Sequence, residues 1–303
     1  MKNFKTPILL IIFNRPDKVK AIMDVLSKIQ PSYLYIAADG PRENIKGEKE
    51  KCTQARRLTE NTPWACERHT HYLDKNNGVD KAIEIAISWF FSEVEEGIIL
   101  EDDCMPNEDF FQFTQTLLNK YRDDKKIMVI CGTNFQDGTK HGEASYYFSK
   151  YHLNWGWASW RRAWSHFDSK LEKLDDFIDN KKIETTLKDE VQRRYWLGFF
   201  KKIRSGKFSF VDSKWQFSIW NAGGICIVPN ANLVKNIGNG PDATHTKMST
   251  DLTAPSEELG PLSHPSNIKI DDNADDYFFY KVHHKTFLKK LRDKILIMIN
   301  AYF

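Results

Sequence analysis

Short apolar runs alternate with amphipathic stretches along the N-terminal third of the chain. Runs that suit buried strands fall at residues 8–13, 33–38 and 97–100, and a further strand is expected at 69–73. Between them, apolar residues at helical spacing predict helices at 16–29, 48–58 and 82–91. This alternation predicts an α/β fold with a mostly parallel central sheet flanked by helices.

Charged residues follow three of these strands at the point where each strand ends. Arg15 comes after the first strand, Asp39 after the second, and Glu101, Asp102 and Asp103 after the strand at 97–100. In open α/β sheets, ligands bind in the crevice outside the carboxyl ends of the strands. We therefore expect these side chains to face one shared crevice.

The acidic cluster Glu101-Asp102-Asp103 suits a site for a divalent cation. A diphosphate leaving group carries negative charge, which a cation neutralises well, and hard carboxylate oxygens favour Mg²⁺ or Mn²⁺. One carboxylate suffices as a ligand when phosphate oxygens complete the coordination, and its neighbours then orient it. An acidic triplet alone is common on protein surfaces, so its place after a buried strand is what favours a site.

Composition narrows the partners and the compartment. The chain has 303 residues and a formal net charge of +3, which is too balanced for nucleic acid as the main partner. Its five cysteines lack the spacing of zinc sites, and we expect reduced thiols, with Cys52 and Cys66 unpaired. The apolar run at 7–13 is too brief for a signal peptide or a membrane span, so a cytoplasmic protein is expected.

The run from Ile98 to Phe111 resembles the DXD segment of N-acetylglucosaminyltransferase I and its bacterial relatives, some of which are labelled hemolysin-activation-like proteins. These are glycosyltransferases of the GT-A fold, which is Rossmann-like. Motif order and spacing match over roughly residues 7–246. The other similar blocks are Ile12–Pro16, Ala38–Arg42, Asn76–Gly78, Ser88–Phe91, Asn154–Trp164, Phe210–Phe217, Gly224–Asn236 and Gly238–Thr246.

The resemblance implies a role for each strand-end residue. Arg15 would contact the donor phosphates, Asp39 the uracil, and Glu101 and Asp102 the ribose region, while Asp103 would ligate Mn²⁺ or Mg²⁺. The residue types agree, because arginine binds phosphate in a bidentate fashion and carboxylates accept from N–H and hydroxyl groups. A surface role for Arg15 and a turn-forming role for Asp39 remain the alternatives.

Asp212 is the candidate general base. Sugar transfer with inversion needs a carboxylate to take the proton of the acceptor hydroxyl, and the apolar neighbours of Asp212 would raise its pKa toward operating pH. The resemblance is imperfect here, because the relatives place a tryptophan or a second aspartate beside this position, where this chain has Val211, Ser213 and Lys214. Lys214 would instead lower the pKa of Asp212 if the two paired.

Three further residues are candidates for the donor site. Trp157 follows Gly156 in an aromatic block and is either a platform for a sugar ring or a core residue, whereas Trp160 and Trp164 are expected in the core. His245 is proposed to contact the donor phosphates, and the alternatives are a metal ligand and a structural loop histidine. Lys81, at the mouth of a predicted helix, is a weaker phosphate candidate.

The predicted organisation is a GT-A domain at 1–250 and a C-terminal extension at 251–303. We assign 1–130 to nucleotide-sugar binding and 131–250 to the acceptor and catalysis. The charged stretch 171–190 is expected to be a solvated helical insertion. Residues 287–299 form an amphipathic, basic segment, either docked on the body or in peripheral contact with the inner face of the cell membrane.

The sequence thus predicts a metal-dependent, inverting bacterial glycosyltransferase. UDP-N-acetylglucosamine is the first donor to consider on the resemblance, and the acceptor would be a glycan or lipid-linked glycan of a surface polysaccharide or lipopolysaccharide. A sugar nucleotidyltransferase remains open, although such enzymes normally carry a Gly- and Lys-rich phosphate loop where this chain has Asn14–Asp17. A catalytically inactive carbohydrate-binding protein is the other alternative.

Overall fold

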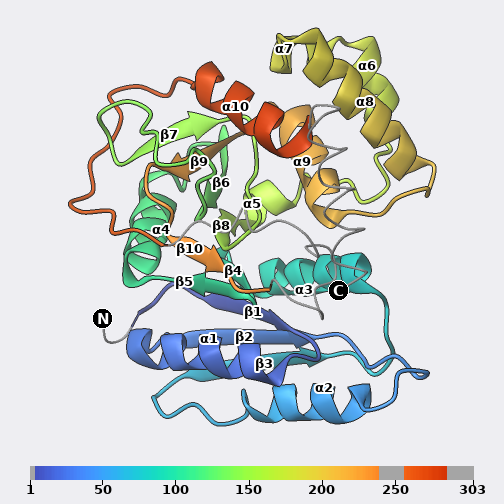
Figure 1. Cartoon of the computed structure of the whole chain (residues 1–303), viewed down its shortest axis with the longest axis vertical. Coiled ribbons are helices and arrows are strands. Elements are labelled where there is room, and N and C mark those ends of the chain that lie inside the picture. The colour runs from blue at the N-terminus through green and yellow to red at the C-terminus, as the bar shows by residue number, and fades with distance from the viewer. Residues whose placement is uncertain (1–3, 239–255, 285–303) are drawn as a thin grey trace, which may run out of the picture.

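The computed structural model describes residues 4–238 and 256–284. Helices cover both faces of a central sheet, and Figure 1 shows the N-terminal elements at one end of the molecule and α6, α7, α8 and α10 at the other. The predicted α/β class, with a mostly parallel sheet between helices, is confirmed. His245 and the amphipathic segment 287–299 lie outside the described residues.

The first half of the chain alternates strands and helices as the sequence predicts. Each predicted element is present, with ends within a few residues of those expected. Helix α3 begins at Val79, before the predicted start at Ala82, directly after Gly78, whose φ of +80° sets the turn. The elements are β1 (Ile8–Ile12), α1 (Pro16–Ile29), β2 (Tyr33–Ala38), α2 (Glu48–Arg57), β3 (Glu67–Tyr72), α3 (Val79–Glu93) and β4 (Glu96–Glu101).

The second half mixes short strands with helices. Its strands are β5 (Cys104–Pro106), β6 (Ile127–Cys131), β7 (Tyr146–Ser149), β8 (Trp157–Trp160), β9 (Ile225–Pro229) and β10 (Val234–Asn236). Its helices are α4 (Glu108–Lys120), α5 (Arg161–Trp164), α6 (Leu174–Asp179), α7 (Lys182–Thr186), α8 (Glu190–Arg204), α9 (Val211–Asn221), α10 (Asp272–Phe278) and the π-helical turn η2 (Phe279–His283).

The described residues form an eight-stranded sheet in the order β3-β2-β1-β4-β8-β6-β9-β7. Strands β3, β2, β1 and β4 are parallel neighbours, as are β6 and β9, whereas β8 and β7 run antiparallel to theirs. The chain moves outward from β1 to β3 and then returns to the other side of β1 as β4. The carboxyl ends of β1 and β4 therefore form a topological switch point, where ligands bind in open α/β sheets.

Side chains of the central strands are buried on both faces. Leu9 packs in one apolar cluster with residues of α3, α8 and α9, whereas Ile8 and Leu10 pack in a second cluster with residues of α1 and α4. Strands covered on both faces need continuous apolar sequence rather than alternation. The runs that first identified β1, β2 and β4 follow from this arrangement.

The predicted insertion at 171–190 is only partly solvated. Asp175 and Asp176 are exposed, as expected, but Leu174 and Phe177 on the other side of α6 are fully buried. The insertion is therefore a helical layer of the body. Trp160 and Trp164 are buried as predicted, and all five cysteines are free.

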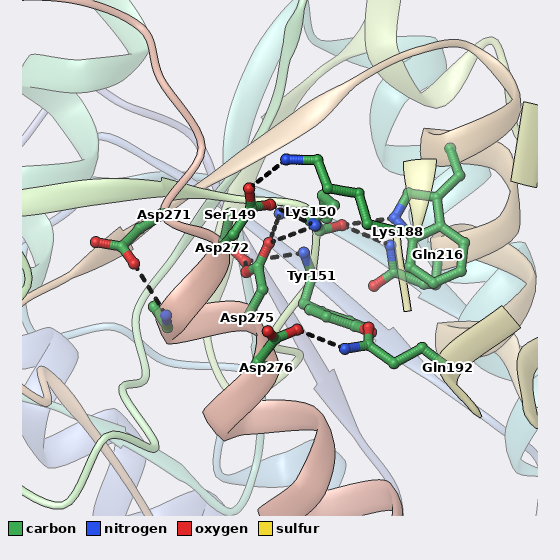
Figure 2. Close-up of polar contacts among 12 residues, drawn as sticks. Ser149, Lys150, Tyr151, Lys188, Gln192, Gln216, Asp271, Asp272, Asp275 and Asp276 are labelled. Carbon is green, nitrogen blue, oxygen red and sulfur yellow. Dashed lines mark hydrogen bonds and ion pairs between the residues drawn. The ribbon is translucent and has the colours of Figure 1, made fainter. Parts of the chain in front are cut away.

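Helix α10 joins the C-terminal extension to the second half of the chain. The buried carboxylate of Asp275 accepts hydrogen bonds from Ser149 Oγ and, at 3.1 Å, from Lys150 N, as Figure 2 shows. Lys150 Nζ in turn donates to Asp272 at 2.8 Å. The phenyl ring of Phe278 and the buried Phe279 extend the main apolar core. This part of the extension is thus integral to the body.

One structural finding concerns membranes. Among the helices of residues 4–238 and 256–284, none combines the length and the apolar character that a membrane span requires.

Candidate active site

A cavity of about 800 Å³ opens at the carboxyl ends of β1, β2 and β4. The starts of helices α3 and α9 form its other wall. The expectation of one shared crevice is confirmed, because the cavity is lined by all the strand-end candidates together with the candidate base. These residues are Arg15, Asp39, Glu101, Asp102, Asp103 and Asp212.

Arg15 lies between two carboxylates at the switch point. Its guanidinium donates to Asp102 Oδ1 and, at 2.8 Å, to Asp103 Oδ2. The backbone fixes this arrangement, since β1 and β4 pair in parallel and Asp102 N donates to Ile11 O at 3.1 Å. Burial alone would lower the pKa of Arg15, but the two carboxylates together raise it, so the arginine stays charged.

The remaining charge of this cluster is only partly compensated. Burial raises the pKa of Asp102 to about 7 despite the opposing charge of Arg15, and Asp102 Oδ2 is buried without a hydrogen-bond partner within the described part of the chain. Burial and the neighbouring Asp103 also raise the pKa of Glu101 well above its usual range. The cluster is therefore a site that binding of positive charge or hydrogen-bond donors would stabilise.

The small sheet formed by β5 and β10 closes around Asp103. Ile237 N donates to Asp103 O at 2.8 Å, and a Cβ on Gly238 would lie 2.2 Å from Asp103 Oδ2. Any larger residue at this position would have to displace the carboxylate of Asp103. Sequence reasoning placed Gly238 in a block of resemblance but gave it no role.

Asp103 can serve as a single protein ligand of a hard divalent cation. Among the residues that the structure describes, no three His, Cys, Asp or Glu side chains are grouped to hold a metal. One carboxylate completed by the phosphate oxygens of a ligand is the usual Mg²⁺ arrangement, and Asp103 faces the cavity with one oxygen paired to Arg15. A cation would therefore bind at Asp103 together with the phosphate group that completes its coordination.

Asp39 lines the cavity and also organises two loops. Its carboxylate accepts hydrogen bonds from Gly40 N at 2.9 Å, from the side chain of Asn76 at 2.9 Å, and from both the backbone and the side chain of Asn77. The contacts of Asp39 in the structure are thus those expected from its turn-forming alternative. These bonds tie the end of β2 to the loop before α3, so Asp39 shapes the cavity wall.

Sequence reasoning missed a polar network beside Asp39. Glu48 is buried and accepts from Asn14 Nδ2 at 2.9 Å and from Arg42 N at 2.7 Å, and it pairs with the Arg42 guanidinium at 2.5 Å. The hydrogen bond from Arg42 is the main reason that the pKa of Glu48 is lowered. Arg42 and Asn14 line the cavity. Their place directly after β1 and β2 was the available signal.

Asp212 lies in the first turn of α9, on the helix wall of the cavity, and its charge is close enough to Glu101 to raise the pKa of Glu101. Asn154 Nδ2 donates to Asp212 Oδ2 at 2.7 Å, and Lys214 forms no ion pair with it within the described ranges. The carboxylate is open to the cavity, yet the surrounding protein atoms desolvate it and raise its pKa to about 6. The negative charge of Asp80 adds to this rise, whereas the bond from Asn154 opposes it.

Two of the sequence candidates, Trp157 and Lys81, are not among the residues that line the cavity. Trp157 is 5% exposed and packs edge-on against His152, near Trp164 and Trp215, so it occupies the core position that the sequence left open. Lys81 is exposed and pairs with Glu84 at 2.7 Å.

Trp155 is the tryptophan that lines the cavity. It is half-buried, and its ring meets Phe135 edge-on at 5.1 Å. Trp155 and Trp157 belong to the same aromatic block, and sequence alone offered only the glycine between them as a guide.

Comparisons with known proteins give distant likenesses only. No protein-family model and no curated protein matches the chain. Similar solved structures include a cytidylyltransferase from Leptospira borgpetersenii, with 14% identity and a TM-score of 0.31 over 57% of this chain and 64% of that chain. This chain thus spans slightly less than two thirds of that protein.

Two other solved structures share a similar degree of likeness. A mannose-1-phosphate geranyltransferase from Thermus thermophilus has 8% identity and a TM-score of 0.34 over 75% of this chain and 73% of that chain. Mouse xyloside xylosyltransferase 1 has 11% identity and a TM-score of 0.33 over 71% of this chain and 81% of that chain. Likenesses at this level assign no activity to this chain, and the residues that line the cavity are the basis for inferring its function.

Proposed function

We propose that the chain is an inverting glycosyltransferase that moves a sugar from a UDP-sugar to a hydroxyl of a glycan acceptor. The observation that carries the proposal is one cavity with two different walls. Arg15, Asp102 and Asp103 form a charged cluster at the strand ends, and Asp212 faces them with a pKa raised to about 6. Transfer of a sugar from a nucleotide sugar needs both a site for the diphosphate and a general base for the acceptor hydroxyl.

The donor would bind along the ends of β1, β2 and β4. Arg15 is a suitable partner for phosphate oxygens because its guanidinium offers paired N–H donors. All four residues Glu101, Asp102, Asp39 and Arg42 line the cavity. In this proposal Glu101 and Asp102 would accept hydrogen bonds from the ribose hydroxyls, and Asp39 with Arg42 would border the uracil. A bound Mn²⁺ or Mg²⁺ at Asp103 would supply charge neutralisation for the departing diphosphate.

Asp212 would act in its ionised form. One oxygen of its carboxylate takes the proton of the acceptor hydroxyl while that hydroxyl oxygen bonds to the anomeric carbon. The bond from the anomeric carbon to the diphosphate oxygen breaks on the opposite face, and UDP leaves with the electron pair. A pKa of about 6 keeps the carboxylate ionised at neutral pH and basic enough to accept a proton.

UDP-N-acetylglucosamine is the first donor to test, and a glycan or lipid-linked glycan of a bacterial surface polysaccharide is the proposed acceptor class. Both choices rest on the family resemblance of the sequence blocks. A sugar nucleotidyltransferase would use the same strand-end carboxylates, but its attacking phosphate is already ionised and needs no base. The raised pKa of Asp212 favours glycosyl transfer over that alternative.

The test is thermal unfolding of the full chain with a panel of nucleotide sugars, with and without Mn²⁺. A donor that binds only the native state raises the apparent stability by about 2.7 kcal/mol at a concentration 100 times its Kd. We expect a UDP-sugar to stabilise the protein in a Mn²⁺-dependent manner and to release UDP slowly. Stabilisation by a nucleoside triphosphate with release of pyrophosphate would instead identify a nucleotidyltransferase.

A further inference from the structure

Asn154 selects one oxygen of the candidate base. Its amide nitrogen donates to Asp212 Oδ2 at 2.7 Å, and the described residues give Asp212 Oδ1 no hydrogen-bond donor. Asn154 and Asp212 both line the cavity. The contact therefore leaves Oδ1 as the oxygen of Asp212 that is available to a ligand in the cavity.

The loop that carries Asn154 is fastened to the same helix as Asp212. Gln216, one turn after Asp212 on α9, accepts from His152 N at 2.7 Å and donates to Lys150 O at 2.9 Å. Figure 2 shows Gln216 beside Lys150, with the carboxylates of α10 on the other side of the same loop. The loop that carries Asn154 and the helix that carries Asp212 are thus joined by hydrogen bonds and are not independent segments.

Asp80 anchors the start of α9 from a different helix. The residue before this helix, Phe210, makes no side-chain capping bond, and Val211 N instead donates to Asp80 Oδ1 at 2.9 Å. A free N–H at a helix start is usually satisfied by a neighbouring residue in the sequence. Here the acceptor comes from the first turn of α3 and brings a negative charge close to Asp212.

We propose that Asn154 and Asp80 are positioning residues for Asp212, Asn154 by fixing which oxygen faces the acceptor and Asp80 by anchoring α9 with a negative charge beside the carboxylate. This inference rests on the proposed role of Asp212 as the general base. Neither residue touches the reacting atoms. Both set how readily Asp212 takes a proton.

Charged and polar groups from several elements face Asp212. Asp80 approaches from α3, Glu101 from the end of β4 and Asn154 from the loop before β8, while Lys214 lies on α9 itself. Burial and Asp80 raise the pKa of Asp212, and the bond from Asn154 lowers it. Removing Asn154 and neutralising Asp80 should therefore shift the pKa in opposite directions.

The first experiment measures the proton affinity of Asp212 without any substrate. The side-chain carboxyl carbons of ¹³C-labelled aspartate are titrated by NMR in the full chain, with Asp212→Asn used to assign the signal. We expect Asn154→Ala to raise the apparent pKa and Asp80→Asn to lower it, each by on the order of half a unit to one unit. Equal values in all three proteins, or shifts of the same sign, would overturn the inference.

A matched variant separates the two roles of Asp80. Asp80→Asn keeps a side-chain oxygen for Val211 N but removes the charge, whereas Asp80→Ala removes both. Thermal unfolding should show a lower Tm for Asp80→Ala than for Asp80→Asn, by roughly 2 °C, because a helix cap is lost. If the two variants are equally stable, Asp80 does not anchor α9.

The second experiment uses turnover once a donor and an acceptor are known. The ionised form of Asp212 is active, so kcat/KM rises with pH through its pKa. The midpoint of that rise should move to higher pH in Asn154→Ala and to lower pH in Asp80→Asn, while the Kd for UDP stays within about twofold. NMR shifts without matching kinetic shifts would leave the positioning intact and reject Asp212 as the base.

Discussion

The two walls of the cavity are built in different ways. On the strand-end wall, Arg15 pairs with Asp102 and Asp103, although the negative charge of the cluster is only partly compensated. On the helix wall, Asp212 is open to the cavity and is held through a single oxygen by Asn154. In the proposed function, the first wall would bind the donor and the second would present the group that accepts a proton.

Burial by protein atoms is the largest cause of the raised pKa at both Asp102 and Asp212, but the two carboxylates differ in their exposure. Asp102 is fully buried and has its pKa raised to about 7 although it contacts Arg15, so its proton affinity reflects a partly compensated charge cluster. Asp212 reaches about 6 while exposed to the cavity, with Asp80 adding to the effect. A raised pKa therefore marks a base only where the carboxylate can also meet a substrate.

The largest expected effect comes from exchanging one carboxylate on each wall for an amide. Asp212→Asn should lower kcat by roughly 10²–10⁴-fold with donor binding retained, because the acceptor hydroxyl loses its proton acceptor. Asp103→Asn should instead abolish the Mn²⁺-dependent part of donor binding. Calorimetric titration with UDP and Mn²⁺, together with single-turnover rates, measures the two losses separately.

The comparison between the walls fails if the two variants lose the same parameter. Full activity in Asp212→Asn would mean that another group takes the proton. Unchanged Mn²⁺-dependent binding in Asp103→Asn would place the cation elsewhere. Asp176→Asn is the matched control, because this exposed carboxylate of α6 lies outside the cavity and should change neither measurement.

The strand-end wall could be predicted from the sequence because its geometry follows from topology. Parallel strands deliver the residues after their carboxyl ends to one edge, so Arg15, Asp39 and Asp103 converge without any long-range detail. What the pattern could not supply was the partner of each group. The bonds from Asn76 and Asn77 to Asp39, for example, depend on the course of the loop before α3.

The helix wall was less predictable because it depends on contacts between distant segments. Asp212 was identified from its chemistry, but Asn154 lies 58 positions away and Asp80 131 positions from its partner Val211. Neither spacing has a local signature. The choice between Trp155 and Trp157 likewise needed the packing of β8 against β4 and β6, which buries Trp157.

Trp155 and Trp157 lie two residues apart, on either side of Gly156, and their substitution should have different effects on stability. Trp157→Ala should destabilise the fold by about 3–5 kcal/mol, because it leaves a large cavity in the aromatic core. Trp155→Ala should cost about 1–2 kcal/mol, since its ring is half-buried. Chemical denaturation measures both, and binding of an acceptor glycan should weaken only in the folded Trp155 variant.

A conservative pair checks the interpretation. Trp157→Phe retains most of the packing and should recover much of the lost stability, whereas Trp155→Phe should retain an aromatic face in the cavity. If Trp157→Ala is as stable as the wild type, the tryptophan is not a core residue. The alternative that Trp157 is a platform for a sugar ring would then be favoured.

The smallest effect is expected for Lys81, the phosphate candidate that the structure places outside the cavity lining. Its ammonium group is exposed and pairs with Glu84 at i+3, so Lys81→Ala should change stability by less than about 0.5 kcal/mol. Arg42→Ala is the contrasting variant, because Arg42 lines the cavity and pairs with the buried Glu48. Its loss should weaken UDP binding and stability together. A tenfold or larger loss of UDP affinity in Lys81→Ala alone would mean that the start of α3 turns toward the diphosphate on binding, so that the helix wall also contributes to donor recognition.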